Sequence, residues 1–272
     1  MGLLGACLPC RSLWRAPVPA EVALERQAER TRAALCRRST AQNAGRLIVQ
    51  GVLQRADWKN KNGRVYTRDI LGREVEKYRL EKVERGRAYG EFDHPDPTTP
   101  AFRELTVQNI SHLVLDVHWE GENLVGTIEI LDTPAGQHLQ ESYRKGRRLG
   151  VSSRGWATLV KRDEAVYIHE DFDLIAFDYV ADPSTYGAYM EPIDWAWRGP
   201  LQDHSDVVQE AHRVVRQHQV NLEKKARLRK PPPSKTKRVA KKAYLKYLMG
   251  APAGAGGVAG PGAMPPAPAS AW

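Results

Sequence analysis

Two apolar runs, Ser111 to Trp119 and Asn123 to Leu131, are separated only by Glu120-Gly121-Glu122. Both runs are rich in the β-branched and aromatic residues typical of strands. A connection this short, with glycine at its centre, predicts a β-hairpin. The middle of the chain is therefore expected to fold as an antiparallel pair of strands.

Further strand-like runs occur on both sides of this hairpin, at residues 46–53, 87–92, 150–159, 165–169 and 171–180. Two segments have helical patterns instead. Thr67 can cap a helix over residues 68–84, and Thr133-Pro134 places proline in the first turn of a helix that runs to about residue 148. Asn62-Gly63 is a favoured tight turn. Together these segments predict an α+β domain, a mostly antiparallel β-barrel or sheet with covering helices.

The ends of the chain differ from its middle in composition. Residues 1–45 are expected to form a poorly specified leader with a short helix near residues 21–38, and the domain itself is expected over residues 46–200. Residues 201–249 form a basic, partly helical tail, with a charged helix expected from Asp203 to Arg229. Residues 250–272 are almost only Ala, Gly and Pro, which cannot build a core, so this stretch is expected to be disordered.

The net charge of +9 belongs to the tail. Residues 203–250 contain 13 Lys and Arg and four Asp and Glu, a difference that equals the charge of the whole chain. The rest of the chain is balanced, so we expect the tail to bind an acidic partner, either a protein scaffold or nucleic acid. No run approaches 18 apolar residues, so no membrane span is expected.

The three cysteines, Cys7, Cys10 and Cys36, all lie near the N-terminus and outside the expected core. An odd number there argues against a disulfide framework and favours a reducing compartment. Cys7 and Cys10 form a single C-x-x-C without a second pair, which makes a zinc site improbable. No cofactor is expected.

The stretch from Gly150 to Gly155, with Ser152 and Ser153 between small residues, is a candidate for nucleophilic chemistry. A serine hydroxyl is a weak nucleophile unless a base takes its proton and a third group orients that base. His94, between an expected strand and Pro95, is the candidate base. Spacing does not choose among the acids that follow the serines, which are Asp171, Asp173, Asp178 and Asp182.

Other interpretations of these residues stay open. Ser153 is an alternative nucleophile, because neighbouring strand residues face opposite sides and only one of the two serines can point at His94. Arg154 is either a surface charge or, with the backbone around Ser153 and Gly155, a support for an oxyanion. Asp93, His94 and Asp96 are an alternative metal cluster. Glu91 is expected to be a structural partner, and ordinary strand histidines are expected at His112, His118 and His169.

Three blocks taken together resemble a known family. They are Asn60-x-Asn62…Arg64-x-Tyr66, then Gly90-Glu91-x-x-His94-Pro95, then Gly150-Val151-Ser152-Ser153-Arg154-Gly155. In this order and at similar distances they are similar to the prohead core proteases of tailed phages, over Arg46 to Pro192. The resemblance implies a herpesvirus-assemblin-like serine protease fold. It also implies that His94 is the base, Ser152 the nucleophile and Asp178, in a looser block, the third member.

One departure from the family concerns Asp93, where relatives carry Asn. A carboxylate there can raise the pKa of the neighbouring histidine, and it leaves open whether Asp93 or Asp178 orients the ring.

The resemblance further implies a capsid-maturation endopeptidase inside the phage prohead, in the host cytoplasm, with scaffold and major capsid proteins as substrates and a possible homo-oligomeric state. Cleavage is expected after Glu, with an aliphatic residue two positions before it and a small residue after it. Val208-Gln209-Glu210-Ala211 meets these conditions and predicts self-processing. The alternative is a non-enzymatic basic scaffold or DNA-binding capsid-assembly protein.

Overall fold

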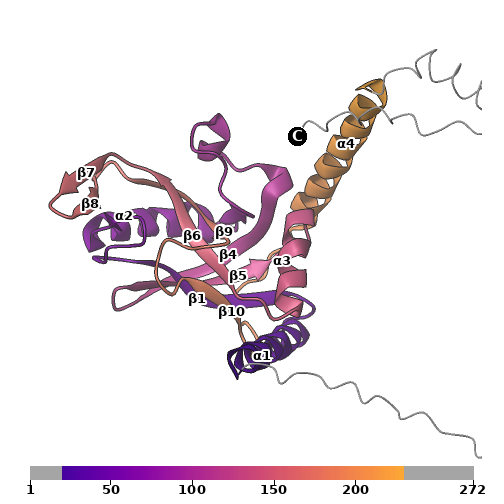
Figure 1. The fold of residues 1–272 in the computed structure, drawn as a ribbon, viewed down its shortest axis with the longest axis horizontal. Coiled ribbons are helices and arrows are strands. Elements are labelled where there is room, and N and C mark those ends of the chain that lie inside the picture. Colours follow the sequence, from indigo (N-terminus) through magenta and orange to yellow (C-terminus); the bar gives the residue numbers. More distant parts are fainter. Residues whose placement is uncertain (1–19, 230–272) are drawn as a thin grey trace, which may run out of the picture. The chain divides into compact units, whose positions relative to one another are not determined.

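The computed structural model describes residues 20–229, and its centre is a seven-stranded sheet (Figure 1). All hydrogen-bonded neighbours in this sheet are antiparallel. The order of the strands is β3 (Tyr89–Glu91), β4 (Ile110–Glu120), β5 (Asn123–Ile130), β1 (Leu47–Arg55), β10 (Tyr189–Pro192), β6 (Leu149–Trp156) and β9 (Asp173–Val180). The expected hairpin is β4–β5, in which Glu120 pairs with Asn123.

The two end strands of this sheet approach each other. Phe92, directly after β3, forms a parallel bridge with Tyr179 of β9, and the N–H of Asp93 donates to the carbonyl of Tyr179 at 2.7 Å. The sheet is therefore nearly closed on itself. With four helices beside it, this confirms the predicted α+β fold with a mostly antiparallel barrel or sheet.

A second, smaller sheet contains β2 (Arg64–Val65), β8 (Ala165–Ile168) and β7 (Leu159–Arg162). Strands β2 and β8 are parallel, with Arg64 opposite Val166. The predicted turn at Asn62-Gly63 precedes β2. Gly63 has a φ of 74°, and the Asn60 carboxamide oxygen accepts hydrogen bonds from the N–H groups of Asn62 and Arg64. This turn therefore fixes where β2 begins.

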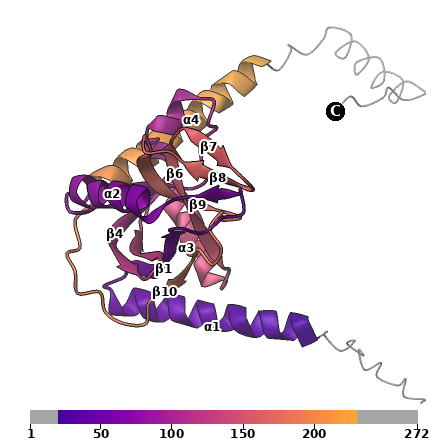
Figure 2. The same cartoon turned by 90° about the vertical axis from the view of Figure 1, so that its left-hand side faces the viewer.

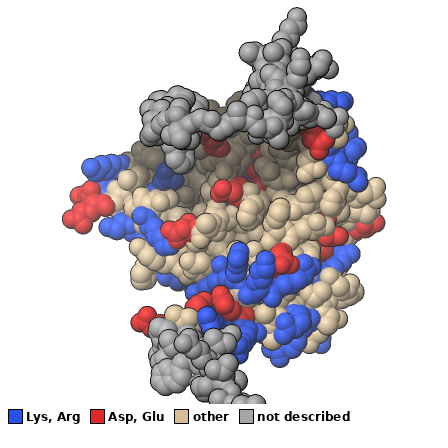
Figure 3. All heavy atoms as spheres, turned by 45° about the vertical axis from the view of Figure 1, so that its right-hand side comes forward, with Lys and Arg blue, Asp and Glu red and all other residues tan. Residues whose placement is uncertain are grey.

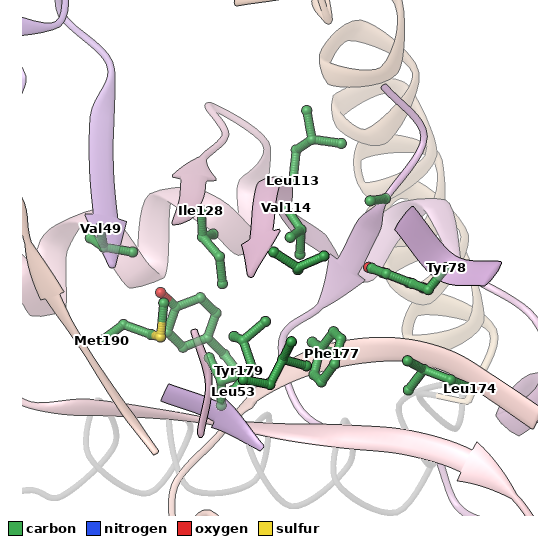
Figure 4. Close-up of a cluster of buried hydrophobic side chains, with 14 of the residues drawn as sticks. Val49, Leu53, Tyr78, Leu113, Val114, Ile128, Leu174, Phe177, Tyr179 and Met190 are labelled. Atoms are coloured by element: carbon green, nitrogen blue, oxygen red, sulfur yellow. The ribbon is translucent and has the colours of Figure 1, made fainter. Parts of the chain in front are cut away.

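The core lies between the curved sheet and its helices (Figure 4). Val49, Leu53 and Ile128 from neighbouring strands are fully buried. The ring of Phe177 packs edge-on against that of Tyr78, with centroids 5.4 Å apart. Burial of such side chains contributes roughly 1.5–3 kcal/mol each to the free energy of unfolding.

Three of the helices lie where the sequence pattern predicts them, but the helix that follows Thr133 ends at Arg144, before the expected residue 148, and one cap differs. Helix α2 (Arg68–Tyr78) continues into a π-helical turn (Arg79–Val83), α3 spans Pro134–Arg144 and α4 spans Ser205–Arg229. Thr133 caps α3 as a hydrogen-bond acceptor for the N–H of Gly136. Thr67 occupies the N-cap of α2, but its side chain makes no cap bond, and the carboxylate of Asp57 accepts the N–H of Arg68 instead.

Helix α1 (Ala20–Gln42) lies within the segment expected to be a leader, yet it packs beside β10 and β1 (Figure 2). The Ser39 hydroxyl donates to the carbonyl of Ile48 at 2.7 Å. Cys36 is only 3% exposed and belongs to the core, so the expectation that no cysteine lies in the core is wrong. The division of the chain at residue 46 stays a prediction.

The chain divides into two units, the first ending at Gln219 and the second starting at Val220, and the boundary between them falls within α4. On the face shown in Figure 3, acidic and basic side chains are interspersed, as expected for a charge-balanced domain. No helix among residues 20–229 is long and apolar enough to cross a membrane. Cys7, Cys10, the basic stretch after residue 229 and the Ala/Gly/Pro stretch at 250–272 lie outside the described residues.

Candidate active site

A cavity of about 440 Å³ brings together segments that are distant in the sequence. Its walls come from the Asn60 turn and β2, from the loop after β3, from β6 with the residues that follow it, and from the segment after β9. His94, Ser152, Ser153 and Arg154 all line it. Three of the sequence-predicted blocks therefore meet at one place.

The register between β6 and β9 decides which side chains share a face. Ser152 pairs directly with Asp178, whereas Ser153 pairs with Phe177, a core residue. Because successive residues of a strand face opposite sides, Ser152, Arg154 and Asp178 share one face of the strand pair, and Ser153, although it also lines the cavity, belongs to the other.

His94 is bound to Asp178. Its Nδ1 lies 2.8 Å from Oδ2 of Asp178, whose side chain is fully buried, while the imidazole is 30% exposed. The other carboxylate oxygen, Oδ1, accepts the backbone N–H of Glu91 at 2.9 Å. A carboxylate on Nδ1 selects the tautomer that leaves Nε2 free to accept a proton.

Ser152 is 7% exposed, and its hydroxyl oxygen lies 3.3 Å from that of Ser184. Ser184 follows β9 by four residues, and its backbone carbonyl accepts the N–H of Lys61 at 2.9 Å. The Ser152 hydroxyl thus has a neutral partner in the segment after β9, which also lines the cavity. Catalytic hydrogen bonds often tighten only when substrate is bound.

Arg154 is 1% exposed, so the surface-charge alternative is wrong. Its Nε lies 2.8 Å from Oδ2 of Asp178 in an ion-pair contact whose direction does not suit a hydrogen bond, and its Nη2 donates to Oδ1 at 3.4 Å. Its Nη1 lies 3.3 Å from Oε2 of Glu91 and donates to the carbonyl of Glu104 at 3.2 Å. Arg154 therefore makes ion-pair contacts with two buried carboxyl groups at once.

Glu91 is fully buried in this network. Burial raises the pKa of its carboxyl group, while the N–H of Thr106 and the guanidinium of Arg154 act in the opposite direction. These contacts agree with the expected structural role of Glu91.

Asp93 and Asp96 are engaged elsewhere. Asp93 has a φ of 71°, in the left-handed region that Asn and Asp tolerate best, and its carboxylate accepts the N–H of His94 at 3.0 Å. The contact with the imidazole ring is made by Asp178. Asp96 accepts the N–H and hydroxyl of Thr98, which lowers the pKa of its carboxyl group. In the described part of the chain, no three His, Cys, Asp or Glu side chains are grouped to hold a metal ion.

The remaining predicted acids bind other partners. Asp171 accepts from Thr158, Asp173 from Lys77 and Asp182 from Lys61. His112 is fully buried, and burial lowers its pKa to about 4; its Nε2 lies 2.9 Å from the carbonyl oxygen of Phe177. His118 lies near two acids on β4, Asp116 and Glu120. His169 lies 3.4 Å from Asp171.

Sequence reasoning missed two features of this site. It gave no role to Ser184, whose hydroxyl oxygen lies 3.3 Å from that of Ser152. It also assigned Arg154 no contact with Asp178, and the spacing of the residues carries no signal for that contact.

Comparisons with known proteins identify relatives of this chain. A family model described as prohead core protein serine protease matches residues 34–196. The prohead core protein protease of Enterobacteria phage T4 is 31% identical over 150 residues, which cover 54% of this chain and 68% of that protein. The solved structure of the bacteriophage T4 capsid assembly protease matches with a TM-score of 0.47 and 25% identity, covering 50% of this chain and 81% of that chain.

Proposed function

Since this chain belongs to the family of prohead core protein serine proteases, we propose that it is a serine endopeptidase that cleaves scaffold and major capsid precursor proteins inside the phage prohead, in the host cytoplasm. The observation that carries the proposal is the buried Asp178, which contacts Nδ1 of His94 and pairs across the sheet with Ser152. A base and its orienting acid thus share a face with a serine beside one cavity.

The proposed reaction begins when Nε2 of His94 takes the proton of the Ser152 hydroxyl. The oxygen attacks the carbonyl carbon of the scissile peptide bond, and the imidazolium then gives the proton to the leaving amine. The resulting acyl-enzyme is hydrolysed by water, with His94 again acting as base. Asp178 holds the imidazole in the required tautomer and stabilises its protonated form, while Arg154 and the N–H of Glu91 keep that carboxylate in place.

The oxyanion is expected to be stabilised beside Ser152 by Ser153, Arg154 and Gly155. The register of β6 against β9 shifts between Arg154 and Gly155, and the extra residue of this bulge is Ile175 on β9. Since the Arg154 side chain is buried and ion-paired, the donors proposed for the developing negative charge are backbone N–H groups of these three residues.

The proposed specificity is cleavage after Glu, and Glu210-Ala211 is the proposed site of self-processing. Both residues lie inside α4, where Ala211 is fully buried and Glu210 is paired with Arg213. A protease needs an extended substrate, so this cut requires local unfolding of the helix. The product ending at Glu210 would have lost every basic residue of the tail, which we propose binds an acidic scaffold or nucleic acid.

A fluorophosphonate probe tests the nucleophile. We expect labelling of the wild-type chain and of Ser153→Ala, and loss of labelling in Ser152→Ala and His94→Ala, with turnover reduced on the order of 10³-fold or more. Ser153→Ala is the matched control because it removes the neighbouring hydroxyl on the other face of β6. Labelling that depends on Ser153 instead of Ser152 would overturn the assignment.

Intact mass analysis tests self-processing. A fragment ending at Glu210 should accumulate in the active protein and be absent from Ser152→Ala. An uncut tail in a demonstrably active preparation would refute the proposal. If the wild-type chain neither reacts with the probe nor cleaves any peptide, a non-enzymatic scaffold or DNA-binding protein is favoured instead.

A further inference from the structure

Three basic residues line the cavity, Lys61, Arg64 and Arg154, although the side chain of Arg154 is itself buried. Two of them are neutralised within the protein. Arg154 is paired with the buried carboxylates of Asp178 and Glu91, and Lys61 is paired with Asp182, which also lines the cavity. Among residues 20–229, no carboxylate lies within ion-pair distance of Arg64. The cavity therefore contains one guanidinium whose charge the described protein does not balance.

Arg64 is held in place by its backbone. Its N–H donates to the side chain of Asn60 at 3.0 Å, and it pairs with Val166 in the parallel β2–β8 pair. The turn before it and the strand beside it thus fix the position of its Cα atom at the wall of the cavity.

The guanidinium lies near Tyr66, two residues further along the chain. Burial raises the pKa of the Tyr66 hydroxyl, and the nearby side chains of Arg64 and Ser153 act against that rise. Arg64, Tyr66 and Ser153 all line the cavity and form a polar patch in the wall that also contains Ser152.

Apolar residues also contribute to the wall of the cavity. Phe172 packs edge-on against Tyr66 with centroids 5.3 Å apart, and Leu159 and Ile168 also line the cavity. An apolar wall suits the methylene groups of a long side chain, and an unpaired arginine binds a carboxylate through two parallel hydrogen bonds.

From this arrangement we infer that Arg64 determines specificity by binding the acidic side chain of the residue whose carbonyl group Ser152 attacks. The inference rests on the proposed function and adds to it the residue that recognises the substrate. It also gives Ser153 a place in the wall of the substrate pocket.

The test uses two peptides that differ only by Glu or Gln before the cleaved bond. The wild-type chain should cleave the Glu peptide with a kcat/KM on the order of 10- to 100-fold above that of the Gln peptide, the range expected for a hydrogen-bonded charge. Arg64→Gln should remove this preference by slowing only the Glu peptide. Arg64→Lys should keep part of it, because the charge remains but the fork geometry does not.

Lys61→Gln is the matched control, because it removes a cavity cation that already has a carboxylate partner. It should leave the preference intact. The ratio of the two rates, measured on one preparation, does not depend on how much of a variant is folded, so a destabilised Arg64 variant remains informative.

The inference is overturned if Arg64→Gln slows both peptides equally, if Lys61→Gln abolishes the preference, or if the wild-type chain cleaves both peptides alike. If the wild-type chain cleaves both peptides alike but a fluorophosphonate labels Ser152, the proposed protease function is retained and the role of Arg64 is refuted. Absence of both labelling and cleavage would refute the proposed function itself and the inference with it.

Discussion

Replacing Arg154 with Met should test the charge network beneath the active site. The guanidinium separates Asp178 and Glu91, and all three side chains are fully inaccessible to solvent. Methionine fills a similar volume without charge, so the substitution leaves two buried carboxylates without a counter-ion. Removing one partner of a buried ion pair costs about 3–5 kcal/mol, a large part of the roughly 5–15 kcal/mol typical of a folded domain.

The loss should depend on pH. Burial already raises the pKa of Glu91 above its ordinary value of 4.5, and Arg154 acts against that rise. Without Arg154, the pKa of Glu91 in the folded state should rise further above its value in the unfolded chain. The free energy of unfolding of the variant should therefore fall as pH rises from about 4.5 through the raised pKa of the folded state.

Urea unfolding of wild type and Arg154→Met at pH 5 and pH 8 measures this effect. The difference between the two proteins should be larger at pH 8. Adding Glu91→Gln to the variant removes one of the two unpaired charges and should restore part of the stability. A loss below about 1 kcal/mol, or one that is equal at the two pH values and unaffected by Glu91→Gln, would refute the reasoning.

Other variants test further features of the fold. A Cβ atom on Gly90 would lie 2.2 Å from both Nε2 of His112 and the carbonyl oxygen of Phe177, so Gly90→Ala should lower the free energy of unfolding by about 3 kcal/mol or more. In a chain lacking Cys7 and Cys10, the Cys36 thiol, whose pKa burial raises, should resist a thiol reagent until urea unfolds the protein, and rapid native labelling would contradict its placement in the core. Deleting residues 220–272 should leave hydrolysis of a short peptide unchanged while weakening salt-sensitive binding to an acidic partner; a large loss of hydrolysis would show that the second unit serves catalysis.

The parts of the fold that the sequence predicts well are those that local interactions determine. The three residues between the central apolar runs predict the β4–β5 hairpin, and Thr133-Pro134 marks the start of α3. A helix is predicted near the position of α1, but its packing against the domain is not, because its apolar periodicity is low and nothing local indicates that Cys36 is buried. The burial of Cys36 results from the contacts of α1 with α3 and with the sheet, whose residues lie far along the chain.

In the candidate site, too, some features could be predicted from the sequence and others could not. Composition and spacing left four acids open as partners of His94, and the resemblance to a family selected Asp178, the acid that the structure places on Nδ1. Arg154 was not predictable from local sequence, because charged side chains are normally exposed. Its burial depends on Glu91 and on the carbonyl groups of residues 101–104, which reach it only in the folded domain.

The bridge between Phe92 and Tyr179 has a consequence for the order of folding. The residues on either side of this closure, His94 and Asp178, are 84 positions apart and come together as the two ends of the sheet meet. Contacts of such long sequence separation carry a high loop-closure entropy and form slowly compared with hairpins. In a chain that has formed β4–β5 but has not yet joined β3 to β9, the proposed base His94 is not yet held by Asp178, so we expect proteolytic activity to arise only as folding is completed.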